Sequence, residues 1–332
     1  VQTEALRPLT DRPLIHNYMG RELSFDHFDV GADLDIASWD SYPIGFLSDR
    51  LDAAEADKQR YLRQGDPDNQ AFHHDLYRAV GRGRWWVMEQ QPGPVNWAPW
   101  NPAPLPGMAR LWAWEAIAHG AEAVCYFRWR QAPFAQEQHH AGLLRPDSAA
   151  TPALSEATDV ANEIADLGQV NLARSASALI FDYQSHWVFD TQPQGADFTY
   201  FGLVLDAYRA LRRAGLSIDI LPPDAPLDGY KLILAPGLAI VSDELKARIA
   251  ASSAATIIGP RSAAKTADGA IPVPLPPAFP GLDATVAFVE SLPPGAVEPF
   301  ADGAGAFNHW SELVETSAET LITTERGAPA LV

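Results

Sequence analysis

Short apolar runs alternate with segments of helical periodicity along the first half of the chain. Each apolar run is stopped by a proline, a glycine or a polar residue, which is typical of buried strands. The segments between the runs place apolar residues about one helical turn apart. Such alternation predicts parallel strands in an α/β architecture. The expected strands are 13–19, 35–40, 85–89 and 122–127, and the expected helices are 68–80, 107–119 and 151–167.

Polar and aromatic residues gather where these predicted strands end. They are Asn17, Trp39, Asp40, Glu89 and Arg128. The carboxyl ends of parallel strands lie along one edge of a sheet, and α/β enzymes carry out their chemistry there. The pattern therefore predicts the active face of a (β/α)8 TIM barrel, of which four strand–helix units are visible in the sequence.

The second half predicts a different α/β domain of flavodoxin-like type. Helix 242–251 begins at Ser242, whose type and position suit an N-cap. We expect one domain over 1–170 and a second over 174–332, and the Pro-, Gly- and Ala-rich tail from about 267 gives no clear pattern. The strands expected in this half are 177–181, 217–221, 231–235 and 255–258, and a further helix is expected over 198–215.

Composition narrows the function classes. The 332 residues suit two domains at roughly 100–200 residues each, and the net charge of −18 disfavours both nucleic acid and anionic membrane surfaces as partners. No apolar run has the ~20 residues of a membrane span. The single cysteine, Cys125, excludes an internal disulfide and a cysteine metal cluster. No signal peptide is recognisable, and we expect a cytoplasmic protein.

Tryptophan is unusually frequent between Trp85 and Trp129, where seven of the ten tryptophans lie. Indole rings stack on the apolar faces of pyranose sugars, so this density suits a sugar site. A tryptophan-rich core would give the same composition. The composition alone leaves both interpretations open.

Four residues are candidates for sugar chemistry. Glu89 ends an apolar strand and is followed by a turn, although a strand-end glutamate can also be merely solvated. Trp97 lies eight residues later, and Glu137 and His140 follow the fourth strand at i, i+3 spacing. On a turn or helix, Glu137 and His140 would share a face and offer acceptors and a donor to neighbouring sugar hydroxyls. The spacing also fits a metal half-site, but no second such motif exists to complete it.

Other histidines are given non-catalytic interpretations. The run His73-His74-Asp75 is interpreted as a surface patch, because adjacent residues on a helix point in different directions. His119 lies late in a predicted helix and suits a partner of the helix dipole better than a metal ligand.

Long motifs in the chain resemble glycoside hydrolase family 42. The run from Met88 to Trp97 resembles the nucleophile strand of that family, and residues 107–144 resemble the segments that follow it. Residues 16–20 and 38–43 resemble two earlier barrel strands, and 178–183 with 259–266 resemble the second domain of the family. The similarity therefore extends over nearly the whole chain.

The resemblance implies a retaining β-galactosidase that needs no cofactor. It implies that Glu89 is the nucleophile, that Trp97, Glu137 and His140 hold the galactose, and that Tyr42 and Phe127 line its subsite. It implies further that the second domain is amidotransferase-like, non-catalytic and responsible for a homotrimer. An amidotransferase activity is disfavoured because this domain has no cysteine after a strand.

One departure from the family concerns the general acid/base, which the family places as a Glu after an Asn at the end of its fourth barrel strand. The one Asn-Glu pair here, Asn162-Glu163, lies in a predicted helix. We therefore expect the chain to be a fragment, or one part of a split enzyme, that lacks the acid/base. The alternative is a non-catalytic assembly or carbohydrate-binding polypeptide, and sugar turnover by the purified chain would distinguish the two.

Overall fold

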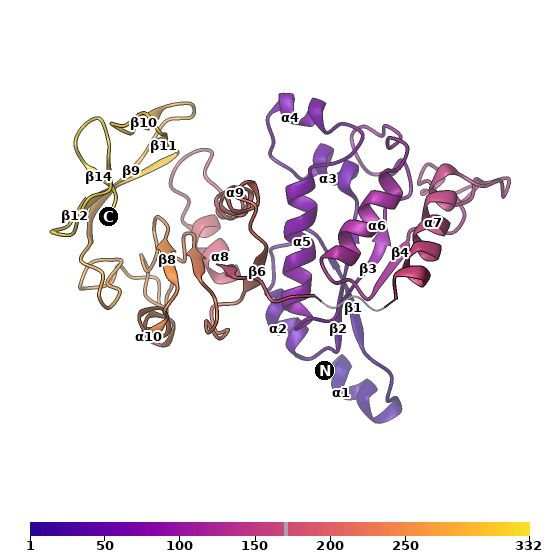
Figure 1. Ribbon diagram of the computed structural model, residues 1–332, viewed down its shortest axis with the longest axis horizontal. Helices are drawn as coiled ribbons and strands as arrows, with labels where there is room; N and C mark the ends of the chain where they lie inside the picture. Colours follow the sequence, from indigo (N-terminus) through magenta and orange to yellow (C-terminus); the bar gives the residue numbers. More distant parts are fainter. Residues whose placement is uncertain (169–171) are drawn as a thin grey trace. The chain divides into compact units, whose positions relative to one another are not determined.

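The chain folds into two compact units. The computed structural model describes residues 1–168 and 172–332, and the units are Val1–Arg174 (unit 1) and Ser175–Val332 (unit 2). Both are drawn in Figure 1 with the element labels used below.

Unit 1 is built on a parallel sheet of four strands in the order β1-β2-β3-β4. All four strands that the apolar runs predicted are present. Within the described residues, β1 and β4 are the outer strands of this sheet. The strands are β1 (Ile15–Met19), β2 (Ile36–Ser41), β3 (Trp85–Gln90) and β4 (Ala123–Tyr126).

The three long helices of unit 1 also agree with the predicted periodicity. They are α5 (Pro67–Val80), α6 (Met108–Ala118) and α7 (Pro152–Leu167). Helix α5 begins after Asp66, whose Oδ1 accepts the N–H groups of Asp68 and Asn69 at 2.9 and 2.8 Å. The shorter helices are α1 (Gln2–Leu6), a 3-10 turn at Arg7–Leu9, α2 (His27–Ala32), α3 (Pro43–Asp49) and α4 (Glu55–Arg60).

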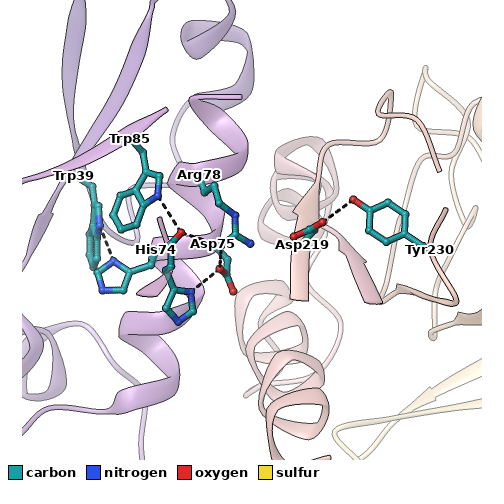
Figure 2. Close-up of polar contacts among 8 residues, drawn as sticks. Trp39, His74, Asp75, Arg78, Trp85, Asp219 and Tyr230 are labelled. Carbon is teal, nitrogen blue, oxygen red and sulfur yellow. Dashed lines mark hydrogen bonds and ion pairs between the residues drawn. The ribbon is translucent and has the colours of Figure 1, made fainter. Parts of the chain in front are cut away.

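The interpretation of His73-His74-Asp75 as a surface patch is wrong, because all three side chains are buried. Asp75 is satisfied by two partners, since its Oδ1 lies 2.8 Å from Nη1 of Arg78 and 2.7 Å from Nδ1 of His119. His119 caps the carboxyl end of α6, as its late position suggested, and its side chain joins that helix to α5. Figure 2 shows His74, Asp75 and Arg78 gathered beside the sheet.

Trp39 does not belong to the face of the sheet that carries the predicted chemistry. Its ring stacks on His73 at 5.1 Å between centroids, and its Nε1–H donates to Nδ1 of His74 at 3.3 Å. Figure 2 shows Trp39 and Trp85 directed towards His74 on α5. Since successive strand residues point to opposite faces, the α5 side is also the side away from Asp40.

Unit 2 contains a second parallel sheet, ordered β6-β5-β7-β8. This is the strand order of a flavodoxin-like domain, as predicted. Apolar residues of β5 and β7 pack with Leu245 and Ile249 of α10 to form its core. The strands are β5 (Ser177–Ile180), β6 (Ile218–Leu221), β7 (Leu232–Ala235) and β8 (Ala255–Ile258), and the helices are α8 (Tyr183–Thr191), α9 (Tyr200–Arg213) and α10 (Asp243–Ala251).

Side-chain hydrogen bonds fix the helix starts in unit 2. Ser242 caps α10 as predicted, with its Oγ accepting the N–H of Leu245 at 3.2 Å. Asp182 caps α8 and also accepts the hydroxyl of Ser185 at 2.5 Å, while that hydroxyl oxygen accepts the N–H of Ala239 at 2.9 Å. These hydrogen bonds therefore connect the carboxyl ends of β5 and β7 to each other. Figure 2 also shows Tyr230, whose hydroxyl donates to Asp219 at 3.0 Å.

The tail that lacked a clear pattern forms short antiparallel strands. Arg261 joins this part to the rest of unit 2, because its guanidinium lies between the rings of Phe189 and Trp310, 4.6 and 4.3 Å from their centroids. The strands are β9 (Thr285–Ser291), β10 (Val297–Pro299), β11 (Ala306–Asn308), β12 (Trp310–Glu315), β13 (Ile322–Thr323) and β14 (Pro329–Leu331).

Candidate active site

The carboxyl ends of β2 and β3 bring two acidic residues together. Asp40 of β2 and Glu89 of β3 are Cα partners in the parallel pairing of these strands. The register shifts just before this pair, between Trp39 and Asp40. Paired residues of neighbouring strands project from the same face of a sheet, so both carboxyl groups lie on the side away from α5.

Glu89 is held by a tyrosine. The hydroxyl of Tyr42 donates to Oε2 of Glu89 at 2.5 Å, and Tyr42 is almost completely buried where β2 leads into α3. Burial first, and then this hydrogen bond, raise the pKa of Tyr42 above its ordinary value. The phenol therefore remains a proton donor to Glu89 over the whole working range of pH.

The backbone after Glu89 is fixed by Gln91. Its N–H donates to the carbonyl of Ser41 at 2.9 Å, and its side-chain oxygen accepts the N–H of Ile44 at 3.1 Å. The amide nitrogen of the same side chain donates to the carbonyl of Gly93 at 2.8 Å. Gln91 thus joins the ends of β2 and β3 to the turn that follows and holds Glu89 in place.

His140 and Phe127 lie beside the Tyr42–Glu89 pair. The His140 ring packs edge-on against Tyr42 and against Phe127, with 5.6 and 4.9 Å between centroids. Burial lowers the pKa of His140, so its imidazole is neutral at pH 7. Its Nε2 is buried and has no hydrogen-bond partner in the part of the chain that the structure describes. That nitrogen is available to a ligand hydroxyl.

Trp97 forms another wall of the same cluster. Its ring meets that of Tyr42 edge-on at 5.5 Å, and its indole packs so closely on Gly45 of α3 that an added methyl group there would lie 2.5 Å from Cη2. The guanidinium of Arg50 lies 5.8 Å from the Trp97 ring centroid. Trp97 keeps 36% of its surface exposed, so part of the indole remains accessible.

Glu137 lies on the turn that ends at His140, where the His140 N–H donates to the Glu137 carbonyl at 3.0 Å. Its carboxylate is exposed and forms an ion pair with Arg128. The Arg128 guanidinium lies 4.6 Å from the centroid of the Phe127 ring. The chain of contacts therefore brings together all six residues that the sequence analysis named: Glu89, Tyr42, Trp97, Phe127, Glu137 and His140.

The tryptophan-rich segment is divided between the core and the candidate site. Trp85 and Trp112 are fully buried and belong to the core, whereas Trp97 lies at the site and Trp129 is exposed. Gly45, Arg50 and Gln91 support the site but were not among the residues predicted from the sequence. The one signal for Gln91 was its place two residues after the candidate nucleophile, and Gly45 and Arg50 carried none.

No group of three or more His, Cys, Asp or Glu side chains placed to bind a metal occurs among residues 1–168 and 172–332. Glu137 and His140 therefore lack further acidic, histidine or cysteine ligands in the described structure. Over the same residues, no helix is both long enough and apolar enough to cross a membrane. The cytoplasmic location stays a prediction.

Both units match known protein families. Residues 1–167 match a family described as beta-galactosidase, and residues 175–332 match one described as beta-galactosidase trimerisation domain. A beta-galactosidase of Thermus thermophilus is 51% identical over 336 aligned positions, which cover all of this chain and 52% of that protein. One from Halorubrum lacusprofundi is 42% identical over 84% of this chain and 40% of that protein. The chain spans about half the length of the curated relatives it matches.

Solved structures show the same relationship. A crystal structure of beta-galactosidase from the psychrophilic Marinomonas ef1 superposes with a TM-score of 0.96 at 46% identity, covering 99% of this chain and 52% of that one. The beta-galactosidase of the Antarctic haloarchaeon Halorubrum lacusprofundi superposes with a TM-score of 0.92 at 37% identity, covering 99% and 51%.

Proposed function

The chain belongs to the glycoside hydrolase family 42 β-galactosidases, and we propose that it carries the nucleophile side of a site that hydrolyses terminal, non-reducing β-D-galactosides with retention. Its fold is the C-terminal part of a TIM barrel followed by a flavodoxin-like domain. The observation that carries the proposal is the 2.5 Å hydrogen bond from Tyr42 to Glu89, at a strand end surrounded by Trp97, Phe127 and His140.

Glu89 is the nucleophile in this proposal. Tyr42 occupies Oε2, which leaves Oε1 to attack the anomeric carbon as the glycosidic bond breaks through an oxocarbenium-like transition state. The leaving oxygen takes its proton from a carboxylic acid outside this chain. That group then removes a proton from water, which attacks the anomeric carbon and releases Glu89.

The surrounding residues bind the sugar. Trp97 stacks on an apolar face of the pyranose, and Phe127 and Tyr42 line the subsite. His140 offers its Nε2, which has no hydrogen-bond partner among the described residues, to a hydroxyl. The carboxylate of Glu137, positioned by Arg128, accepts another. A site of this kind selects galactose because a sugar with a misplaced hydroxyl leaves buried polar groups unpaired.

Unit 2 mediates assembly in this proposal. Its match to a trimerisation domain supports a homotrimer in which residues 174–332 supply most of the contact surface, while residues 1–170 form part of the barrel. Sedimentation velocity of the purified chain tests this, because a strictly monomeric species at micromolar concentration would contradict it.

The nucleophile is tested by covalent trapping. We expect 2,4-dinitrophenyl 2-deoxy-2-fluoro-β-D-galactoside to add one fluorogalactosyl group to residues 1–332, because its leaving group departs without acid assistance. Peptide mapping should place the group on Glu89, and Glu89→Gln should prevent labelling. Glu122→Gln is the matched control, since Glu122 lies at the amino end of the neighbouring strand β4, away from the strand end that carries Glu89, and is paired with Arg84 at 2.8 Å. Labelling at another carboxylate of the folded chain would refute the assignment.

A further inference from the structure

Two carboxyl groups of the site lie side by side but in unlike surroundings. Asp40 and Glu89 are Cα partners across β2 and β3 and project from the same face of the sheet. Asp40 is 5% exposed, whereas Glu89 is half-buried. Two adjacent carboxylates away from bulk water repel each other, so a proton is favoured on the less solvated group, Asp40.

The hydrogen bonds of the two groups are also unequal. Glu89 accepts a 2.5 Å hydrogen bond from Tyr42 at Oε2. Asp40 accepts one longer bond at Oδ2, 3.3 Å from the amide nitrogen of Asn17, and within the described residues its buried Oδ1 has no hydrogen-bond partner. A buried carboxylate with so few donors is costly. The negative charge is therefore better placed on Glu89.

The charged and titratable groups around Asp40 do not offset this cost. Arg50, the cation that acts on Asp40, forms an ion pair with Asp49 at 3.5 Å and has a weaker effect than burial. Tyr42 and Tyr77, two tyrosines that interact electrostatically with Asp40, are phenols whose pKa burial raises, so they carry no charge at neutral pH. Burial first, and then the charge of Glu89, raise the pKa of Asp40 to about 7.

We propose that Asp40 is a positioning residue for Glu89: it keeps the proton that the pair shares, so that Glu89 is the anion that attacks the sugar. This inference rests on the proposed function, in which Glu89 is the nucleophile. With the proton on Glu89, the carboxyl group would have no free charge for attack. A neutral Asp40 also spares the site a second negative charge beside the first.

The location of the proton is tested without any turnover. Residues 1–332 carrying 13C at the aspartate and glutamate carboxyl carbons are titrated by NMR. We expect one aspartate resonance to titrate near pH 7 and to be missing in Asp40→Asn. In Glu89→Gln the same resonance should titrate at lower pH, because the neighbouring charge is gone. A resonance that persists in Asp40→Asn, or that Glu89→Gln leaves unmoved, would overturn the inference.

The effect on Glu89 is tested by the pH dependence of trapping with the dinitrophenyl fluorogalactoside. In the wild-type chain the rate of labelling should show an inflection near pH 7, where Asp40 loses its proton. Asp40→Asn cannot ionise and should lack that inflection. Asp35→Asn, at the start of the same strand segment and paired with Arg7 at 2.7 Å, should retain it.

Each outcome of the trapping experiment decides a separate point. Identical pH profiles for wild type and Asp40→Asn would overturn the positioning role. Absence of labelling in every variant, together with the expected NMR titration, would overturn Glu89 as nucleophile and the positioning role with it, while leaving the proton on Asp40.

Discussion

The hydroxyl of Tyr42 donates to Oε2 of Glu89 at 2.5 Å across the ends of two neighbouring strands. The two residues are 47 positions apart, and the pairing of β2 with β3 brings them together. The donor is buried and the acceptor is half-buried, so little water competes for the bond. The orientation of Glu89 therefore depends on Tyr42.

Removing this hydroxyl should slow the attack by Glu89. A hydrogen bond to a charged group contributes about 1.5–3 kcal/mol, so Tyr42→Phe should lower the rate of fluorogalactoside trapping by roughly 10- to 100-fold. Tyr61→Phe, on a tyrosine that ends α4 elsewhere in unit 1, is the control and should trap at the wild-type rate. Unchanged trapping by Tyr42→Phe would show that the hydrogen bond does not position the nucleophile.

Adding a methyl group at Gly45 should weaken sugar binding and spare the fold. The new carbon would lie 2.5 Å from Cη2 of Trp97, which must move aside. Trp97 is partly exposed and can move, and alanine is favoured over glycine in a helix such as α3. We expect Gly45→Ala to weaken galactose binding by about 2- to 10-fold, the size of a lost aromatic contact.

Calorimetric titration with galactose, beside thermal unfolding, measures both properties of Gly45→Ala. Ser48→Ala is the matched control, because Ser48 lies one turn later on α3 and bonds to the carbonyl of Gly45. A loss of thermal stability with intact binding would contradict the role given to Gly45.

Buried histidines should make unit 1 sensitive to acid. Burial lowers the pKa of His27 to about 4 and that of His73 to about 3, from an ordinary 6.5. The unfolded chain therefore binds more protons than the folded one below pH 6.5. The stability that these two groups contribute is complete above that pH and declines as the pH falls through 4. Each adds a slope of about 1.4 kcal/mol per pH unit within its window.

Urea unfolding between pH 6.5 and 4 tests this sensitivity. Tryptophan fluorescence reports on unit 1, because all tryptophans except Trp187 and Trp310 lie there. His27→Phe keeps an aromatic ring beside Tyr18 and should reduce the slope of unfolding free energy by about 1.4 kcal/mol per pH unit. His139→Gln, at an exposed position, should leave the slope unchanged. Equal slopes for His27→Phe and wild type would contradict the prediction.

The parallel sheets could be predicted because their information is local. Buried parallel strands are rich in apolar residues, and β1 to β8 each correspond to a strand predicted from such a segment. The N-cap of α10 could be predicted for the same reason, since Ser242 and the Leu245 N–H are three residues apart. The strands of the tail could not be predicted in this way. Four of them, β10, β11, β13 and β14, have two or three residues each and depend on partners that no short pattern identifies.

Polar residues whose partners are distant in sequence could not be placed from the sequence. Asp75 looked like a surface residue, but it is buried against Arg78, three residues away, and His119, 44 positions away, and the second contact could not be predicted from a local pattern. At the site, the resemblance singled out Glu89, and Asp40 was visible as a strand-end carboxylate. Their adjacency depends on the register of β2 and β3, including the shift just before Asp40, which the sequence does not specify.

The last prediction concerns turnover by residues 1–332 alone, which we expect to be absent with lactose. Lactose has a poor leaving group and needs a general acid, whose assistance is typically worth about 10²–10⁴-fold. Among the described residues the carboxyl group paired with Glu89 is Asp40, which is buried and on a neighbouring strand rather than across the sugar. The outer strands β1 and β4 also present unpaired edges in the described sheet, so the sheet that carries the site is open at both edges.

Comparing two substrates distinguishes the lack of a general acid from the lack of a formed sugar subsite. Nitrophenyl β-D-galactoside has a leaving group that departs largely unaided, so slow release of one nitrophenol per chain should occur if the subsite is formed, and Glu89→Gln should abolish it. Lactose should give no glucose under the same conditions. Sustained lactose hydrolysis would mean that an acid/base lies within residues 1–332, and Asp40→Asn would then be the first variant to assay, because Asp40 is the carboxyl group that pairs with Glu89 and has a pKa raised to about 7.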